Sequence, residues 1–404
     1  MSGSAPLGSR ALEANGPEPQ TVEVSVVIPC LNEAGTLAFC IESAQRALRE
    51  NGIRGEIIVA DNGSSDDSAN IASTAGARVV TIRDRGYGSA LMGGIGAANG
   101  KFIVMGDADA SYDFGEIPRF VEKLREGNDL VQGCRLSAGG GHILPGAMPF
   151  LHRFVGNPMF SMMARWWFRA PIHDIHCGMR GFTRELFRDL EQRCTGMEFA
   201  SEMVIKSVML RARVAEVPIT LKPDGRISRA SHLRTFRDGW RHLRFFLLYC
   251  PRWLFLIPGG ALIVLGLAGY GIAMPGLRIR GVTFDVHTLL FASLSIICGY
   301  QSIVFAFLTK VFAISEGLLP KDRRVDRLFH FVNLEKGLAV GAVMMTVGVV
   351  LLLAAVNEWR LKDFGDLDYV RTMRWVIPGL TLTTLGFQTI LSSFFLSILG
   401  LRRR

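Results

Sequence analysis

The apolar run Phe102–Met105 leads, after one glycine, to two carboxylates separated by a single residue, Asp107 and Asp109. Consecutive apolar residues are typical of a strand inside a parallel sheet, where both faces are covered. Carboxylates at the C-terminal end of such a strand lie where open α/β sheets bind their ligands. Two hard oxygen ligands suit Mg²⁺ or Mn²⁺, ions that usually share their coordination with substrate phosphates. A solvated acidic turn has the same spacing, so the pair alone leaves both interpretations open.

Polar side chains follow two other predicted strands, which contain Ile28 and Ile58. The polar residues at these two strand ends are Asn32, Glu33, Asp61, Asn62 and Asp66. Each one alone could form an Asx-turn or cap a helix. Three such ends on one sheet edge, with Asp107 and Asp109 on the third, favour a binding site over three unrelated turns.

The elements that position these residues alternate between strand and helix. Strand-like runs cover 22–29, 56–60, 78–82, 101–105, 130–133 and 215–220. Helical patterns cover 34–50, 68–75, 89–98 and 116–126. Alternation of this kind predicts βαβ units and a parallel sheet in an α/β domain over residues 22–230.

Gly86 and Gly88 follow a predicted strand and open a predicted helix, as in a dinucleotide-binding fingerprint. The fingerprint fails at its third glycine, where Leu91 stands. We interpret the two glycines as a tight turn that lets the backbone approach a phosphate. Simple loop flexibility explains them nearly as well.

Four runs in the second half carry no charged residue: 253–274, 288–309, 337–356 and 375–400. Each has the ~20 residues that a helix needs to cross a bilayer core. They predict a four-helix transmembrane domain over 253–404. Lys and Arg are concentrated in 221–252, in 310–336 and at the C-terminus. The positive-inside rule therefore places the α/β head and both termini in the cytoplasm, and we expect a bacterial inner or plasma membrane.

The segment 231–252 predicts an amphipathic helix in the headgroup plane, with Arg237, Arg241 and Arg244 on one stripe. An ordinary packed helix with a solvated basic face is the alternative. This basic segment accounts for much of the net charge of +9, so anionic lipid is the expected partner, and no nucleic acid is expected. The polar composition of residues 1–21 predicts a disordered tail and no signal peptide. Seven cysteines without a Cys-x-x-Cys pair fit a reducing compartment.

The ordered motifs at 26–33, 61–66 and 107–109 resemble those of family-two glycosyltransferases of the GT-A fold. Arg135 after Gly133, the run from Asp174 to Phe182, and the pair Glu198 and Glu202 narrow the resemblance to polyprenyl-phosphate sugar synthases. This group includes dolichyl-phosphate mannose synthases and bacterial polyprenyl-phosphate glucosyltransferases. The resemblance covers about 24–252. It implies inverting transfer of one hexose, mannose or glucose, from a UDP- or GDP-sugar to a polyprenyl (dolichyl or undecaprenyl) phosphate.

The resemblance also implies roles for individual residues. Nucleotide-sugar binding falls on Pro29, Asn32, Glu33, Asp61, Asn62, Asp66, Gly88, Asp107, Ala108 and Arg229. Asp109 and Ser111 match the positions that bind Mg²⁺ or Mn²⁺. Relatives often have Gln at the position of Ser111. Arg135 and Arg153 match the arginines that hold the acceptor phosphate, an oxyanion that suits a guanidinium fork. Asp107, Asp109 and Arg135 are the expected catalytic residues.

Several alternatives stay open. Asp174, Arg180 and Glu202 fit a buried acid–arginine arrangement as well as a site. His173, His176 and Cys177 are expected to pack rather than to bind metal. Another acceptor, such as ceramide or a growing polysaccharide, is the alternative within enzymes. A scaffold or glycolipid translocator with a degenerate head is the alternative outside them. Small residues in the first and fourth spans fit packing within or between chains, so a homo-oligomer is possible.

Overall fold

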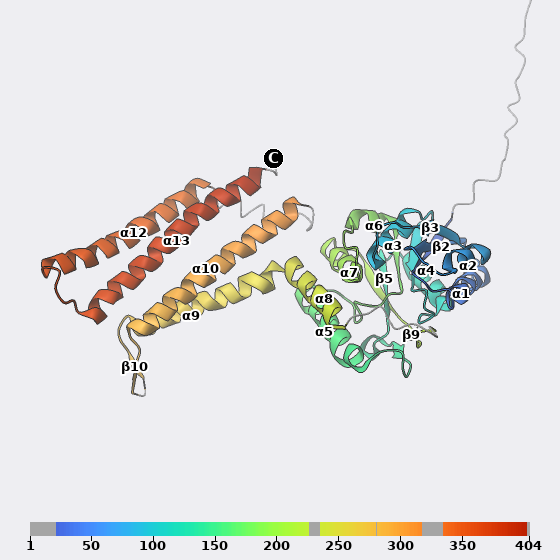
Figure 1. Ribbon diagram of the computed structural model, residues 1–404, viewed down its shortest axis with the longest axis horizontal. Coiled ribbons are helices and arrows are strands. Elements are labelled where there is room, and N and C mark those ends of the chain that lie inside the picture. Colours follow the sequence, from blue (N-terminus) through green and yellow to red (C-terminus); the bar gives the residue numbers. More distant parts are fainter. Residues whose placement is uncertain (1–21, 226–234, 280, 317–333, 402–404) are drawn as a thin grey trace, which may run out of the picture. The chain divides into compact units, whose positions relative to one another are not determined.

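The computed structural model describes residues 22–225, 235–279, 281–316 and 334–401 (Figure 1). The chain divides into two compact units, Met1–Thr235 and Phe236–Arg404. The predicted tail 1–21 and the candidate residue Arg229 lie outside the described residues.

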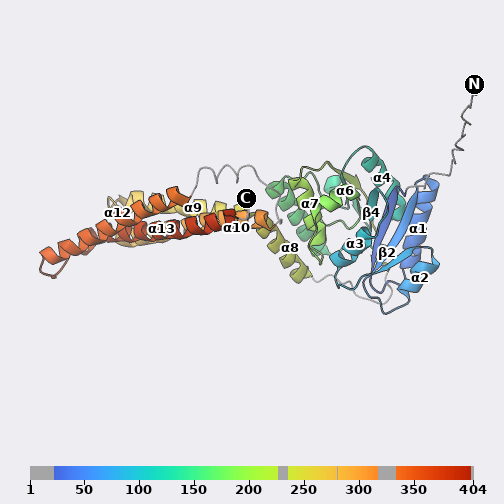
Figure 2. The same ribbon diagram turned by 90° about the horizontal axis from the view of Figure 1, so that it is seen from above.

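A seven-stranded sheet forms the centre of the first unit, with the order β3-β2-β1-β4-β7-β5-β8. Two of its strands, β2 and β4, are labelled in Figure 2. Its strands are β1 Val24–Cys30, β2 Gly55–Asp61, β3 Arg78–Thr81, β4 Phe102–Met105, β5 Leu130–Cys134, β7 Arg180–Thr183 and β8 Val214–Pro218. The prediction of a parallel sheet is wrong at one position, because β7 runs antiparallel to both β4 and β5. The sequence predicted no strand there. Its four residues, RGFT, offer little strand signal, and the pairing depends on the two neighbouring strands.

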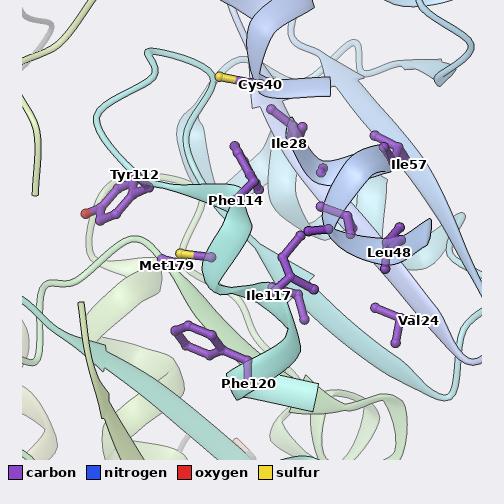
Figure 3. Close-up of a cluster of buried hydrophobic side chains, with 14 of the residues drawn as sticks. Val24, Ile28, Cys40, Leu48, Ile57, Tyr112, Phe114, Ile117, Phe120 and Met179 are labelled. Atoms are coloured by element: carbon purple, nitrogen blue, oxygen red, sulfur yellow. The ribbon is translucent and has the colours of Figure 1, made fainter. Parts of the chain in front are cut away.

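Helices cover both faces of this sheet because the side chains of its strands alternate in direction. Val24, Val26 and Ile28 of β1 share one core cluster with residues of two helices, α1 Leu37–Glu50 and α4 Ile117–Arg125 (Figure 3). On the other face α3, Tyr87–Gly96, packs so closely that a Cβ at Gly94 would meet Val27 Cγ1 at 2.7 Å. The sheet is thus a buried platform whose strand ends are held in fixed positions.

The shorter elements of this unit complete the layers. They are α2 Ser68–Thr74, η1 Phe114–Glu116, η2 Ser137–Gly139, β6 His142–Ile143, η3 His152–Gly156, α5 Asn157–Met163, η4 Ala164–Phe168, α6 Arg184–Leu190, α7 Phe199–Met209 and β9 Thr220–Leu221. The elements η3, α5 and η4 follow one another without a break and form one helical stretch. β6 and β9 pair as a separate parallel ribbon.

The second unit is helical. It contains α8 Thr235–Tyr249, η5 Arg252–Leu256, α9 Ile257–Ala273, the hairpin of β10 Arg278–Ile279 and β11 Val282–Thr283, α10 Val286–Ser315, α12 Leu334–Leu361 and α13 Tyr369–Leu401. Four stretches are long and apolar enough to cross a membrane: Arg252–Ala273, Val286–Ser315, Leu334–Leu361 and Tyr369–Leu399. The prediction of four such helices is therefore confirmed. The basic helix predicted before the first span is present as α8, and its position in a headgroup plane stays a prediction.

Glycines set how closely the long helices approach one another. A Cβ at Gly259 of α9 would meet the carbonyl oxygen of Gly299 of α10 at 2.8 Å. A Cβ at Gly341 of α12 would likewise meet the carbonyl oxygen of Gly386 of α13 at 2.8 Å. Small residues let helix backbones approach closely inside membranes. The small-residue pattern noted in the sequence is therefore used within the chain.

Candidate active site

The carboxyl ends of β1, β2 and β4 meet at one edge of the sheet, as the sequence predicted. Cys30 pairs with Asp61 across β1 and β2, and Val27 pairs with Met105 across β1 and β4. The register therefore brings the residues after each strand together. Thr36 Oγ1, at the start of α1, donates a hydrogen bond of 2.7 Å to the carbonyl of Ala108. This bond ties the first strand end to the segment between Asp107 and Asp109.

Asn32 joins the first and second strand ends. It adopts the left-handed conformation, with φ 59°, which asparagine tolerates better than most residues. Its Oδ1 accepts hydrogen bonds from the Ser65 N–H at 2.6 Å and the Asp66 N–H at 3.3 Å. Its own N–H donates to Ser64 Oγ at 2.9 Å. In this structure Asn32 shapes the loop, and its predicted contact with a nucleotide sugar stays a prediction.

Asp66 has a similar local role. Its Oδ1 accepts from the N–H and Oγ of Ser68 at 3.1 and 2.6 Å, and its Oδ2 accepts from the Ala34 N–H at 3.2 Å. Burial acts to raise the pKa of Asp66, but hydrogen bonds led by that of the Ser68 hydroxyl outweigh burial and lower the pKa. Ser68 Oγ also accepts from the N–H of Glu33 at 2.9 Å, and Glu33 is buried. The site edge is thus charged and tightly connected.

Asn62 links the end of β2 to the turn that precedes α3. Its Oδ1 accepts from the Gly86 N–H at 2.8 Å, and its Nδ2 donates to the Asp84 carbonyl at 2.7 Å. The neighbouring Asp61 is buried, and its Oδ1 accepts from the Ser64 N–H at 3.1 Å. Asp61 and Asn62, both predicted to bind the nucleotide sugar, are therefore positioned by hydrogen bonds within the chain.

Tyr87 lies beside Asp107, although the sequence assigned no role to its side chain. Its hydroxyl donates a hydrogen bond of 2.9 Å to Asp107 Oδ1. Burial, followed by the negative charge of Asp107, holds the pKa of Tyr87 well above its ordinary value, so the hydroxyl keeps its proton. The signal in the sequence that could have identified Tyr87 is its position between Gly86 and Gly88. Close packing of both glycines fixes the backbone there and therefore the direction of the Tyr87 side chain.

The glycines that flank Tyr87 pack against backbone. A Cβ at Gly86 would meet the Thr195 carbonyl oxygen at 2.3 Å, and one at Gly88 would meet that of Cys194 at 2.2 Å. The Gly88 N–H donates to the Thr195 carbonyl at 2.9 Å. These contacts explain both glycines without a phosphate. The predicted nucleotide-sugar role of Gly88 remains untested.

A buried ion pair holds residues 193–195, the segment against which Gly86 and Gly88 pack. Glu202 and Lys206, both on α7, lie 2.8 Å apart, with side chains only 0% and 5% exposed. The Glu202 carboxylate also accepts from the N–H groups of Arg193 and Cys194, the shorter at 2.8 Å. Glu202 therefore has a structural position in this structure. It holds residues 193–195, which in turn hold the turn that carries Tyr87.

Asp109 and Ser111 form the predicted metal position. Asp109 Oδ1 accepts from the Ser111 N–H at 3.0 Å and from Ser111 Oγ at 2.6 Å. Among the residues the structure describes, no three acidic, His or Cys side chains gather as a metal cluster. Mg²⁺ bound together with substrate phosphates needs only one or two protein carboxylates. The half-exposed carboxylates of Asp107 and Asp109 fit an ion of that kind.

Arg135, at the end of β5, makes a buried bidentate pair with Asp174. Its Nε donates to Asp174 Oδ2 at 2.7 Å and its Nη2 to Oδ1 at 2.9 Å. Its Nη1 donates to the Tyr112 hydroxyl at 3.3 Å, and the same hydroxyl accepts from the Gly178 N–H at 2.8 Å. A Cβ at Gly178 would meet Asp107 Oδ2 at 2.6 Å. Arg135 is thus connected to Asp107 through two intermediate residues.

Burial acts to lower the pKa of Arg135, but the charge of Asp174 outweighs burial and raises the pKa well above its ordinary value. Asp174 is itself held by its N–H, which donates to Glu216 Oε1 at 3.1 Å. His173 packs beside it, with its Nδ1 2.7 Å from Glu216 Oε2. The pairing of Asp174 with Arg135 gives this acid a structural role that the sequence left open.

Arg180 also stands at a structural position. It is fully buried on β7, where its Nη1 and Nη2 donate to the carbonyls of Ala200 and Cys177 at 2.9 and 2.6 Å. No carboxylate among the described residues forms an ion pair with it, so the expected acid–arginine pairing involves Arg135 instead. Burial lowers the pKa of Arg180.

Arg153 lies on η3, apart from the cluster around Asp107. Within the described part of the chain its guanidinium makes no hydrogen bond to that cluster, and it lies 5.3 Å from the ring centroid of Phe154. The helical stretch that carries it exposes large apolar side chains to an unusual degree. They are Phe150 at 72%, Leu151 at 53%, Phe154 at 58%, Val155 at 50%, Met162 at 54% and Trp166 at 65%.

Arg229 lies outside the described residues. The described chain before it passes along the candidate metal position. The Gly225 N–H donates to the Asp109 carbonyl at 2.8 Å, and the Lys222 N–H donates to that of Ser111 at 2.9 Å.

A mixed α/β sheet with acidic residues at its carboxyl edge, followed by apolar helices, defines a GT-A enzyme with a helical membrane region. A model of "Glycosyl transferase family 2" matches residues 25–191, and one of "Glycosyltransferase family 2 C-terminal transmembrane region" matches 307–400. A low-salt glycan biosynthesis hexosyltransferase of Haloferax volcanii is 36% identical over 385 residues, which cover 93% of this chain and 89% of that protein. The chain belongs to glycosyltransferase family 2 and is a membrane glycosyltransferase.

Two further likenesses are more limited. A dolichyl-phosphate hexose transferase of Haloferax volcanii is 32% identical over 198 residues, which cover 49% of this chain and 82% of that protein. A crystal structure of glucosyl-3-phosphoglycerate synthase from Mycobacterium tuberculosis matches 56% of this chain and 77% of its own, at 24% identity and a TM-score of 0.43. A structural likeness of that size supports no argument about this chain's substrate.

Proposed function

We propose that this chain transfers one hexose, mannose or glucose, from a UDP- or GDP-sugar to a polyprenyl phosphate in the membrane. The observation that carries the proposal is the arrangement around Asp107. The Tyr112 hydroxyl accepts hydrogen bonds from the guanidinium of Arg135 and from the N–H of Gly178, and Gly178 packs against the Asp107 carboxylate. Asp109 follows Asp107 by two residues at the same sheet edge. Acids for a metal-bound diphosphate beside a guanidinium that positions a second phosphate are what this reaction requires.

The donor half of the proposal rests on the strand ends. Asp61, Asn62 and Glu33 are buried and positioned at the edge where nucleotides bind to open α/β sheets. Asp109 with Ser111 would hold Mg²⁺ or Mn²⁺, which would neutralise the charge that develops on the diphosphate leaving group. Asp107 would keep its orientation through the Tyr87 hydroxyl. Asp109 would do so through the two hydrogen bonds from Ser111.

The acceptor half rests on the phosphate's own chemistry and on the exposed helical stretch. A phosphate monoester is already anionic at neutral pH, so positioning by cations suffices and no general base is needed. Arg153 is half-exposed and lies next to exposed Phe154, a combination that suits a phosphate at a lipid surface. The likeness to a dolichyl-phosphate hexose transferase supports a lipid phosphate as acceptor. The likeness to a hexosyltransferase over 89% of its length supports a hexose as the sugar.

The distribution of Lys and Arg supports a cytoplasmic head, as the positive-inside rule requires. We propose residues 22–230 as the transferase domain, 231–252 as an interfacial segment and 253–404 as the membrane domain. The linked arrangement of Asp107 and Arg135 also weighs against a degenerate head, because a scaffold or translocator would have no use for it.

The test is transfer by the full chain in membranes, with labelled UDP- and GDP-hexoses, polyprenyl phosphate and Mn²⁺ or Mg²⁺. We expect a metal-dependent glycolipid from one of the donors. Asp109→Asn should lower the rate by about a hundredfold or more, because a bound ion stabilises the charge of the transition state by several kcal/mol. Asp189→Asn is the matched control, since its side chain is 59% exposed and makes only a loose 3.8 Å pair with Arg188.

The proposal fails if no common donor gives a metal-dependent glycolipid, or if the Asp109 and Asp189 variants turn over equally fast. Arg153→Ala separates the two substrates. It should raise KM for the polyprenyl phosphate and leave KM for the nucleotide sugar within about twofold. Removing a contact weakens binding only of the substrate that made this contact. An equal rise in both values would remove Arg153 from the acceptor site.

A further inference from the structure

Two glutamine side chains meet in the middle of the membrane region. Gln301 stands fifteen residues after the start of α10 and fourteen before its end. Gln388 stands nineteen residues after the start of α13 and thirteen before its end. At 1.5 Å per residue both lie about 20 Å or more from either helix end, well away from any headgroup. Gln388 Nε2 donates to Gln301 Oε1 at 2.8 Å.

This single bond leaves most of the hydrogen-bonding capacity of the two amides unused. A primary amide offers two N–H donors and an oxygen with two lone pairs. Gln388 Oε1 is buried and has no hydrogen-bond partner among the described residues. The amide nitrogen of Gln301 donates to no residue in the described part of the chain, although its side chain is exposed.

Several other hydroxyl groups of the spans pair with one another inside the chain. Tyr270 OH lies 2.6 Å from Ser293 Oγ and 3.2 Å from Thr381 Oγ1, and Tyr300 OH lies 2.6 Å from Thr389 Oγ1. The amide pair differs because the side chain of one member, Gln301, is exposed. It lines an open pocket on the surface of α10 and α13 whose lining residues are Tyr300, Gln301, Val304, Gln388, Leu391 and Ser392.

A lipid environment cannot supply what these amides lack. No water is present in the hydrocarbon core, so an unsatisfied polar group there is strongly unfavourable. Acyl chains neither donate nor accept hydrogen bonds. The partner must therefore bring donors and acceptors to mid-bilayer depth on a membrane-spanning segment of its own, and polar side chains hydrogen-bond across helices in this way.

We propose that this face binds the same face of a second copy of the chain. An amide is complementary to another amide, since each has a donor and an acceptor. A twofold axis along the membrane normal would bring two Gln301–Gln388 pairs together at equal depth with both copies in the same orientation, as an isologous interface requires. The glycine faces cannot serve, because Gly259, Gly299, Gly341 and Gly386 already pack within the chain.

The side chains around the pair fit such an interface. On α10, Phe305 is 46% exposed one turn after Gln301, and on α13, Leu391 is 54% exposed one turn after Gln388. Cys298 is exposed one turn before Gln301 on the same helix. The amides would thus be enclosed by apolar contacts, with a thiol of each copy close to the axis.

Stoichiometry of the full-length protein in lipid bilayers tests the proposal, measured by single-molecule photobleaching over a range of protein-to-lipid ratios. We expect dimers for the wild type and a dissociation constant about tenfold or more higher for Q301L/Q388L, which removes the amides and keeps the apolar volume. F291L/F387L is the matched control. It changes two exposed side chains of the same helices, 68% and 54% exposed, and should dimerise like the wild type.

Bismaleimide cross-linking in native membranes provides a second measurement. The wild type should give a cross-linked dimer through Cys298 that disappears in Cys298→Ser and weakens in Q301L/Q388L. A monomeric wild type, or equal dimerisation of Q301L/Q388L and the wild type, overturns the proposal. So does a polar lipid that co-purifies with a monomeric wild type and is lost from the glutamine variant. None of these readouts depends on the sugar or the acceptor, so they stand apart from the proposed reaction.

Discussion

Replacing Lys206 by Met tests whether the ion pair with Glu202 is a structural clamp beneath the site. The ammonium uses all three of its donors: Glu202 Oε1 at 2.8 Å, the Leu190 carbonyl at 3.0 Å and the Glu191 carbonyl at 2.9 Å. Met has a similar length and flexibility, so the variant removes charge and hydrogen bonds with little change in volume. What remains is a fully buried carboxylate without its counter-ion.

The size of the effect follows from that burial. Removing one partner of a buried ion pair costs about 3–5 kcal/mol, because the other charge stays buried and unpaired. The N–H groups of Arg193 and Cys194 still bond to Glu202 and keep the cost from rising further. For a domain of about 200 residues, 1 kcal/mol shifts Tm by ~2–4 °C. We therefore expect Tm of the transferase unit to fall by about 6–20 °C.

Differential scanning calorimetry of the full chain in lipid nanodiscs measures this shift. Lys123→Met is the matched control, because Lys123 makes a pair of similar length, 2.9 Å, with Glu126, but both side chains are exposed. It should leave Tm unchanged within error. Hydrogen exchange adds a local readout: the amides of Gly88 and Ser89, which bond to the Thr195 carbonyl, should lose protection in Lys206→Met. Equal Tm values for the two lysine variants would refute the clamp.

Two further predictions concern single groups of the transferase unit. Tyr87→Phe removes the donor to Asp107 Oδ1, and a hydrogen bond to a charged group contributes about 1.5–3 kcal/mol. Initial rates of hexose transfer should fall about tenfold to a hundredfold, with Tyr369→Phe, an exposed tyrosine, as control; equal rates would show that Asp107 is oriented by other contacts. Burial acts to raise the pKa of Glu56, but hydrogen bonds led by that of Ser25 outweigh burial and lower the pKa below its ordinary value. The stabilisation that Glu56 provides is thus present above its unfolded pKa and lost as pH falls through its folded pKa. Glu56→Gln should be less stable than the wild type at pH 7, and the difference should shrink as the pH falls, as followed by Tm against pH; a difference that does not change with pH would contradict this.

The elements that carry the site follow from local sequence patterns. Strand and helix signals are periodic over a few residues, and Phe102–Met105 and the uncharged spans show that signal strongly. The acids after β1, β2 and β4 then converge for a topological reason, since parallel strands place their carboxyl ends at one edge. Sequence alone therefore locates Asp61, Asp107 and Asp109 at a common edge.

What sequence reasoning missed depends on contacts between distant segments. The bond of Arg135 to Asp174 spans 39 residues, and nothing in the spacing selects Asp174 over another acid. β7 pairs antiparallel with both β4 and β5, although RGFT has little strand character. Gly88 matched a phosphate-binding pattern, yet the structure shows the Cys194 carbonyl where a Cβ would stand. Sequence patterns identify residues with unusual requirements, whereas only the packed structure shows which residues they contact.

The charge balance around Arg135 bears on how a lipid phosphate could be held. Asp174 takes two of its hydrogen bonds, so the pair is neutral as a unit and cannot by itself attract a dianion. Arg153 has no carboxylate partner among the described residues, is half-exposed and lies beside the exposed ring of Phe154. We infer a division of work in which Arg135, fixed by Asp174, sets the geometry of the phosphate site and Arg153 supplies the net charge. A fixed guanidinium loses little freedom on binding, and a flexible one at the surface can follow a headgroup that moves with its bilayer.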